Sequence, residues 1–90
     1  MPRAYNVTIM PSDELRDNTI DFATQLERLE EEFANSFTRR FSLIQRDADQ
    51  ELIDREQQKY KNIQRKMKTV GNKKRKTDGE LRRRELLLLR

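Results

Sequence analysis

From Ser12 to Val70 the chain contains no glycine and no proline, the two residues that most readily interrupt a helix. Ser12 is typical of a helix N-cap, and the carboxylates that follow it suit the positive end of a helix dipole. Gly71 comes after a lysine-rich stretch and is typical of a helix C-terminus. The pattern predicts an all-α chain with helix over 12–70, about 88 Å long if it is continuous.

One cluster of weak helix formers, Asn-Ser-Phe-Thr at residues 35–38, leaves a second arrangement open. A hydroxyl of this cluster could cap a second helix, so that the region would fold as an antiparallel hairpin. Against a break here, apolar residues recur every fifteen positions through the cluster, in the column Phe22, Phe37, Leu52 and Met67. The sequence therefore leaves both a single rod and a hairpin open.

Four segments follow from these signals. We expect an N-terminal arm over 1–11 and a long helical region for dimerisation and binding over 12–70. A basic linker over 71–79 and a short C-terminal helix over 80–90 complete the chain. Asp78, near the end of the linker, would cap the short helix.

Composition argues against a self-sufficient monomer. Only 33% of the 90 residues are hydrophobic and 40% are charged, and small chains bury a modest fraction of their surface even when well packed. The apolar residues form a narrow stripe, which predicts a coiled-coil or helical-bundle homodimer, parallel or antiparallel. The predicted dimer interface comprises Phe22, Leu26, Leu29, Phe33, Phe37, Phe41, Ile44, Leu52, Ile63 and Met67.

Charge is unevenly distributed along the chain. Residues 13–36 carry a net charge of −6, whereas residues 59–90 carry +10. One interpretation is structural: the acidic third lies against the basic third of a partner, in antiparallel pairing centred near residue 45. The other is functional, because a strongly basic segment attracts phosphate. The two interpretations are compatible.

A strip of basic and amide side chains runs along one face of the predicted continuous helix. At 100° per residue its members fall nearly opposite the apolar stripe, and no carboxylate interrupts them. The aromatic residues lie on the apolar stripe instead, which disfavours base stacking and leaves binding to a duplex backbone. With a basic run at 73–76, the predicted nucleic-acid-binding residues are Arg39, Arg46, Gln50, Gln57, Lys61, Gln64, Lys68, Lys73, Lys74, Arg75 and Lys76.

The residue types that the chain lacks argue against most kinds of catalysis and metal binding. With no histidine and no cysteine, the chain lacks the usual general base, the usual thiol nucleophile and the common zinc ligands. We therefore predict no enzymatic activity, no metal, no cofactor and no small-molecule substrate. No signal peptide and no membrane-spanning run is visible, which predicts a protein of the cytoplasm or nucleus without a membrane partner. The basic run at 73–76 resembles a nuclear import signal.

At the level of architecture, residues 12–70 resemble the small nodavirus-type viral suppressors of RNA silencing. The resemblance rests on the dimerising stripe together with the basic strip from Arg39 to Lys68. It implies a helical-bundle dimer that lays a basic face along double-stranded RNA, reads no bases and shields the duplex from nucleases. The rival interpretation is a coiled-coil scaffold or assembly protein with charge-steered pairing. The residues alone do not distinguish RNA from DNA.

Overall fold

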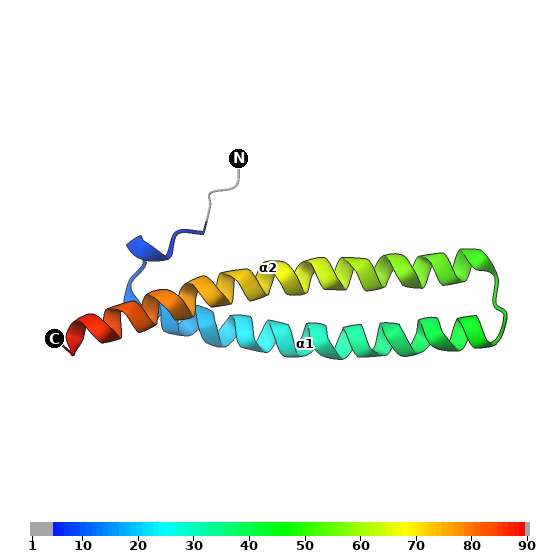
Figure 1. Ribbon diagram of the computed structural model, residues 1–90, viewed down its shortest axis with the longest axis horizontal. Helices are drawn as coiled ribbons and strands as arrows, with labels where there is room; N and C mark the ends of the chain where they lie inside the picture. The colour runs from blue at the N-terminus through cyan, green and yellow to red at the C-terminus, as the bar shows by residue number, and fades with distance from the viewer. Residues whose placement is uncertain (1–4, 90) are drawn as a thin grey trace.

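The computed structural model describes residues 5–89 and is an antiparallel hairpin of two long helices (Figure 1). Helix α1 spans Ser12–Gln45 and helix α2 spans Gln50–Leu88, and a single turn of 3-10 helix, η1, covers Val7–Ile9. No strand occurs in the described part of the chain. The all-α prediction and its hairpin alternative are therefore confirmed.

The hairpin turns at residues 46–49, so the predicted break at 35–38 is wrong. Asp47 adopts a left-handed backbone conformation with φ of 52°, which aspartate tolerates better than most residues. The Ala48 amide then donates to the Leu43 carbonyl at 3.0 Å, and the Asp49 carbonyl accepts from the first turn of α2. Four residues without glycine or proline thus reverse the chain.

The weak helix formers at 35–38 remain helical because their hydroxyls find partners without ending the helix. Ser36 is completely buried, and its hydroxyl donates to the Glu56 carboxylate of α2 at 3.4 Å. The hydroxyl of Thr38 donates to the Ala34 carbonyl one turn back, at 3.0 Å. Tertiary packing here overrides helix propensity.

Helix α2 continues through the segment 71–79, so the predicted linker and the separate helix over 80–90 are wrong. Each interior glycine costs a helix about 1 kcal/mol relative to alanine. Side-chain contacts in this segment oppose that cost: Lys74 donates to Asp78 at 2.6 Å, and the hydroxyl of the buried Thr77 lies 2.7 Å from that of Tyr5. Gly71 is thus an interior residue of α2 and not a helix C-terminus.

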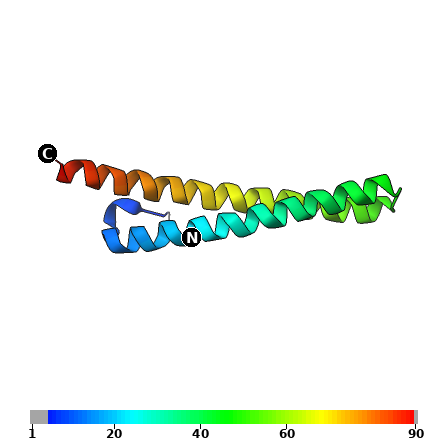
Figure 2. The same cartoon turned by 90° about the horizontal axis from the view of Figure 1, so that it is seen from below.

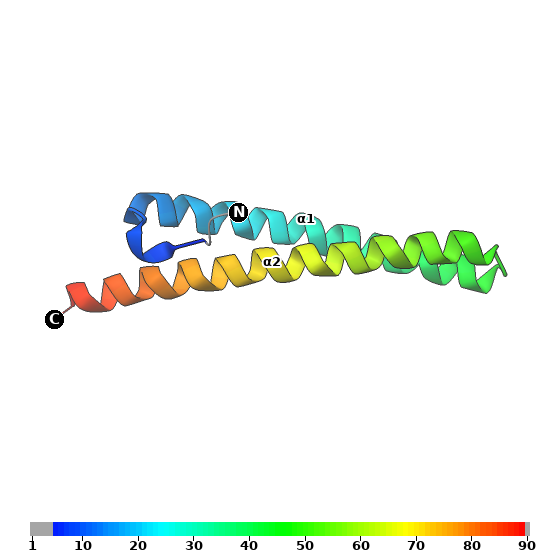
Figure 3. The same ribbon diagram turned by 90° about the horizontal axis from the view of Figure 1, so that it is seen from above.

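The N-terminal segment packs against the open end of the hairpin, where α1 begins and α2 ends (Figures 1 and 3). The hydroxyl groups of Tyr5 and Thr77 are 2.7 Å apart, and the Tyr5 ring meets Phe22 edge-on. Ser12 is the first residue of α1 and not its N-cap; its hydroxyl accepts a hydrogen bond from Arg84 at 3.0 Å. Residues 1–4 of the predicted arm lie outside the described residues.

The core of the hairpin is small, and only some of the residues predicted to form a dimer interface are buried in the hairpin. Leu15 and Ile63 are the buried hydrophobic residues in the described chain. Of the ten predicted interface residues, six are buried or half-buried within the single hairpin: Phe22, Leu26, Leu29, Phe33, Ile63 and Met67. The other four remain exposed by 44–53%: Phe37, Phe41, Ile44 and Leu52.

The hairpin also brings the two charged thirds of the chain together. Thr19 donates to Asp78, and Phe33 stacks on Tyr60 with ring centroids 4.5 Å apart, so acidic α1 lies beside basic α2. The sequence interpretation assigned this antiparallel pairing to two chains, whereas one chain makes it about its own turn. The helices wind around each other (Figure 2), and neither carries an apolar stretch able to cross a membrane in its described residues.

Candidate nucleic-acid interface

A groove of about 340 Å³ lies between the helices beside the turn, and we call it the loop-end groove. Arg39 comes from the end of α1 and Arg46 is its C-cap residue, and α2 contributes an arginine and a lysine from its beginning. The residues lining it are Arg39, Ser42, Leu43, Arg46, Leu52, Arg55, Glu56 and Lys59. The groove is thus lined by four cationic side chains and by one carboxylate, that of Glu56.

Helix geometry explains why these cations share one groove. Arg39 and Arg46 are seven residues apart, and Arg55 and Lys59 are four apart, so each pair lies on one face of its helix. The turn at 46–49 folds these two faces toward each other. Arg46 caps the end of α1, and its Nε donates to the Ser42 carbonyl at 3.4 Å.

Glu56 lies at the base of the groove and is only 9% exposed. Its carboxylate accepts from the buried Ser36 hydroxyl and lies 3.5 Å from the Arg39 guanidinium and 3.4 Å from the Lys59 ammonium. The side chains of Arg39 and Lys59 nevertheless remain 59% and 63% exposed. Because both cations are more than half exposed, they can contact an incoming anion while they remain near the Glu56 carboxylate.

The continuous basic strip predicted from the sequence is wrong, because the turn splits it between two antiparallel helices. Arg39 and Arg46 enter the loop-end groove. Gln50 donates to Asp54 at 2.9 Å, and Gln57 is half-buried. Two residues advance a helix by about 200°, so the exposed members Lys61, Gln64 and Lys68 lie across α2 from the side that holds Lys59.

The basic run at 73–76 is helical and points in several directions. Lys74 forms an ion pair of 2.6 Å with Asp78, whereas Lys73, Arg75 and Lys76 are exposed. Burial raises the pKa of Asp78, but hydrogen bonds from Lys74 and Thr19 outweigh it and leave that pKa below its ordinary value. These residues do not join the loop-end groove.

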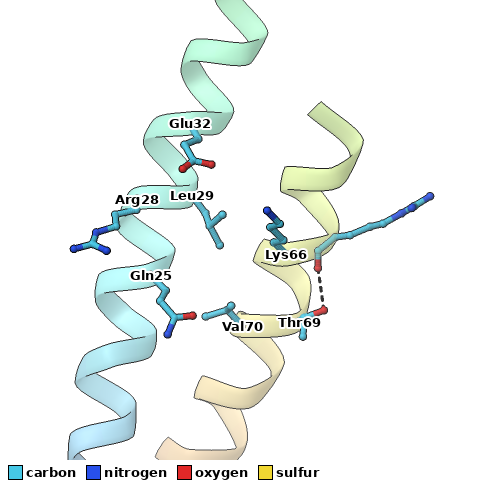
Figure 4. Close-up of a pocket in the computed structure, with 8 residues that line it drawn as sticks. Gln25, Arg28, Leu29, Glu32, Lys66, Thr69 and Val70 are labelled. Atoms are coloured by element: carbon cyan, nitrogen blue, oxygen red, sulfur yellow. Dashed lines mark hydrogen bonds between the residues drawn. The ribbon is translucent and has the colours of Figure 1, made fainter. Parts of the chain in front are cut away.

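The middle of the hairpin carries a second groove of about 450 Å³, with a different character. Figure 4 shows Leu29 and Val70 between the helices, while Arg28 points away from α2. Lys66 of α2 and Glu32 of α1 also line this groove (Figure 4). Arg28, Arg65 and Lys66 are its cationic lining residues, so positive charge beside the grooves is not confined to the turn. Within the part of the chain that the structure describes, no cluster of carboxylates could hold a metal ion.

Sequence reasoning missed Arg55, Glu56 and Lys59 as site residues. In the continuous-helix reading, Arg39 and Glu56 lie more than four turns apart, although their charged groups are in contact. The usable signal was Asp49, an aspartate immediately before α2, which is typical of a helix start. A hairpin folded about that position brings Arg39 level with Glu56.

At the opposite end of the hairpin, Glu80 and Arg84 fasten the N-terminal segment. Arg84 donates to Glu80 at 2.9 Å, to the Ser12 hydroxyl at 3.0 Å and to the Val7 carbonyl at 3.2 Å. Arg83 donates two further hydrogen bonds to the same carboxylate. The hydrogen bonds from Arg83 and then from Arg84 lower the pKa of Glu80 to about 2.

This pKa predicts a loss of stability in acid. Because the pKa of Glu80 falls from 4.5 to about 2 on folding, its contribution is present above 4.5 and is lost as the pH falls toward 2. We expect Glu80→Gln to melt below the wild type at about pH 6 and to converge with it near pH 2. Thermal melts followed by circular dichroism measure this difference. A gap that stays constant over the range contradicts the prediction.

Comparison of the chain with protein-family models, with curated proteins and with solved structures gives no match. The function is therefore argued from the geometry of the hairpin itself.

Proposed function

We propose that this protein binds nucleic acid through the loop-end groove, with duplex RNA as the favoured ligand and without reading base sequence. The observation that carries the proposal is that Arg39, Arg46, Arg55 and Lys59 line one groove, whose only carboxylate among the described residues is that of Glu56. Arginine and lysine bind phosphate through charge-assisted hydrogen bonds, and arginine does so in a bidentate geometry. Binding of this kind positions a protein on the backbone and carries no sequence information.

The long acid-free stretch of α2 supports the same ligand class. Residues 57–77 contain nine lysines and arginines and no carboxylate. Of these nine, Lys59 and Lys74 are in ion pairs in the described chain. Lys61 and Lys68 lie on the flank of α2 away from the groove, so this run strengthens the general attraction of the hairpin to phosphate and does not supply a direct contact from every residue.

The positions of the aromatic residues favour a duplex over a single strand. None lines the loop-end groove. Phe33 and Tyr60 stack on each other and Phe22 contacts Tyr5, while the exposed Phe37 and Phe41 do not line the groove. Among the described residues, no ring therefore offers a platform for an unpaired base in the groove. Ser42 supplies a hydroxyl beside the four cations, suited to a ribose 2′-hydroxyl. Coverage of an RNA duplex in this way would shield it from nucleases, as in suppression of RNA silencing.

Salt-dependent binding to a labelled duplex RNA tests the proposal. The wild type should bind at low salt, with log affinity falling by about 0.7–0.9 per log unit of salt for each phosphate contact. Arg46→Gln with Lys59→Gln should weaken binding about tenfold or more, because each lost charged hydrogen bond is worth about 1.5–3 kcal/mol. The double variant should also reduce the slope of log affinity against log salt concentration by the equivalent of about two phosphate contacts.

A matched variant, Arg75→Gln with Lys76→Gln, removes the same charge outside the groove. It should weaken binding less than the groove variant does. A larger loss in this control would move the interface to the 73–76 run. Absence of any wild-type complex at low salt would exclude nucleic-acid binding.

A coiled-coil scaffold is the second candidate function. The half-exposed side chains Phe37, Phe41 and Ile44 favour it, because one face of α1 presents them to solvent. A scaffold role predicts assembly that depends on protein concentration and on these residues, with no retention of RNA.

A further inference from the structure

One face of the hairpin, opposite the loop-end groove, remains incompletely covered. On α1 it carries Phe37, Phe41 and Ile44, exposed by 48%, 53% and 51%. The Arg40 guanidinium lies 5.0 Å from the Tyr60 ring and so points toward α2. Arg39 and Phe41, one residue to either side of Arg40, therefore lie on opposite flanks of α1. We call this second surface the aromatic face.

Helix α2 completes the aromatic face with polar and basic side chains. Tyr60 faces α1, so Lys59 and Lys61 lie on opposite flanks of α2, and Lys61 is on the flank away from the groove. Gln64 and Lys68 follow Lys61 at three and seven residues and share its flank. The aromatic face thus combines an apolar row on α1 with a basic row on α2.

The overall shape indicates that this face has an occupant. The hairpin measures 62 × 30 × 16 Å, which is a single layer of helices, whereas stable domains pack two layers around a core. It exposes 7384 Å², against about 5,600 Å² for a compact monomer of 10.9 kDa. The excess is more than the roughly 800 Å² that each partner buries in a standard interface.

We infer that the occupant is a second copy of this chain, packed face to face with both turns at the same end. This arrangement lays α1 of each copy along α2 of the other. The inference is independent of nucleic-acid binding, because it uses the face opposite the groove. It leaves both loop-end grooves on the outside of a four-helix bundle.

Charge selects this orientation over the reverse one. Glu30 lies seven residues before Phe37 and therefore on the same flank of α1. Because Phe33 stacks on Tyr60, Glu30 is level with Gln64. With both turns at one end, Glu30 of one copy lies near Lys61 and Lys68 of the other. With turns at opposite ends, acidic α1 would run along acidic α1 and basic α2 along basic α2, which is repulsive.

Spin-label distances test the orientation directly. The chain has no cysteine, so Asp17→Cys and Gln45→Cys each give one labelled site per copy. The measured distance joins the same labelled residue in the two copies, a like pair. In the inferred dimer this distance should be roughly 20–30 Å for both variants, which is two to three helix diameters. The two sites are about 42 Å apart along α1, so a dimer of the reverse orientation must place at least one like pair about 40 Å or more apart. One such long distance overturns the inferred orientation.

Sedimentation equilibrium tests the aromatic face. Phe41→Glu should weaken dimerisation about tenfold or more, because it places a carboxylate in an apolar contact. Ile9→Glu is the matched control: Ile9 is 80% exposed on the N-terminal segment and should leave the dimer unchanged. Circular dichroism shows whether Phe41→Glu remains helical. A monomeric wild type, or equal dissociation by both variants, overturns the inference.

Discussion

Leu15→Ala is expected to lower the free energy of unfolding by about 2–5 kcal/mol, the range for truncating a buried leucine. Leu15 is 0% exposed, and in the described chain it is the one hydrophobic residue with no solvent-accessible surface. A chain of this size has a total stability of about 4–13 kcal/mol, so the substitution removes a large part of it. Urea denaturation followed by circular dichroism measures the change.

Leu86→Ala provides the control for that result. Leu86 is 56% exposed on α2, so the same truncation there removes little packing. We expect a change of about 0.5 kcal/mol or less in the control. Equal losses for the two variants would mean that the open end of the hairpin contributes no core.

Glu56→Gln is expected to strengthen RNA binding by about two- to thirtyfold. The amide keeps the shape of the side chain and can still accept from Ser36, but it releases Arg39 and Lys59 from their ion pairs. The cationic partners are more than half exposed, so solvent screens each ion pair to about 0.2–1 kcal/mol, and the sum of two gives this range of affinity. Titration of labelled duplex RNA at constant salt measures the gain.

Asp13→Asn makes the same charge change at the opposite end of the hairpin. Asp13 pairs with Arg16 at 2.7 Å near the start of α1, and neither residue lines the groove. We expect a smaller gain in affinity from this control. If both variants bind RNA equally well, the effect belongs to net charge and not to the groove.

Much of the fold could be predicted from the residues, because local rules dominate a helical chain. The stretch from Ser12 to Val70 without glycine or proline predicted helix, and most of it is helical. The turn was missed, because it contains neither glycine nor proline and its sequence signals are two aspartates, Asp47 and Asp49. The glycines predicted an end to the helix that α2 does not have, because contacts with the N-terminal segment hold that region.

The candidate site was predicted only in part. Arg39 and Arg46 could be singled out from their spacing on one helix face. Arg55 and Lys59 join them because the chain folds back on itself. Angular positions on one continuous helix do not show which residues this reversal brings together. The same fold places Lys61 and Lys68 on another surface. It also leaves some aromatic residues exposed and packs others between the helices. Contacts between segments distant in the chain decided each of these outcomes.

The position of the turn also sets the order in which the hairpin can assemble. Residues beside the turn meet after closure of a very short loop, whereas Ser12 and Arg84 meet only across seventy-two positions. We therefore expect the helices to zip from the turn toward the open end, with docking of Tyr5 on Thr77 as the last step. Amide hydrogens of the N-terminal segment should exchange before those near the turn, because the contacts that form last open first.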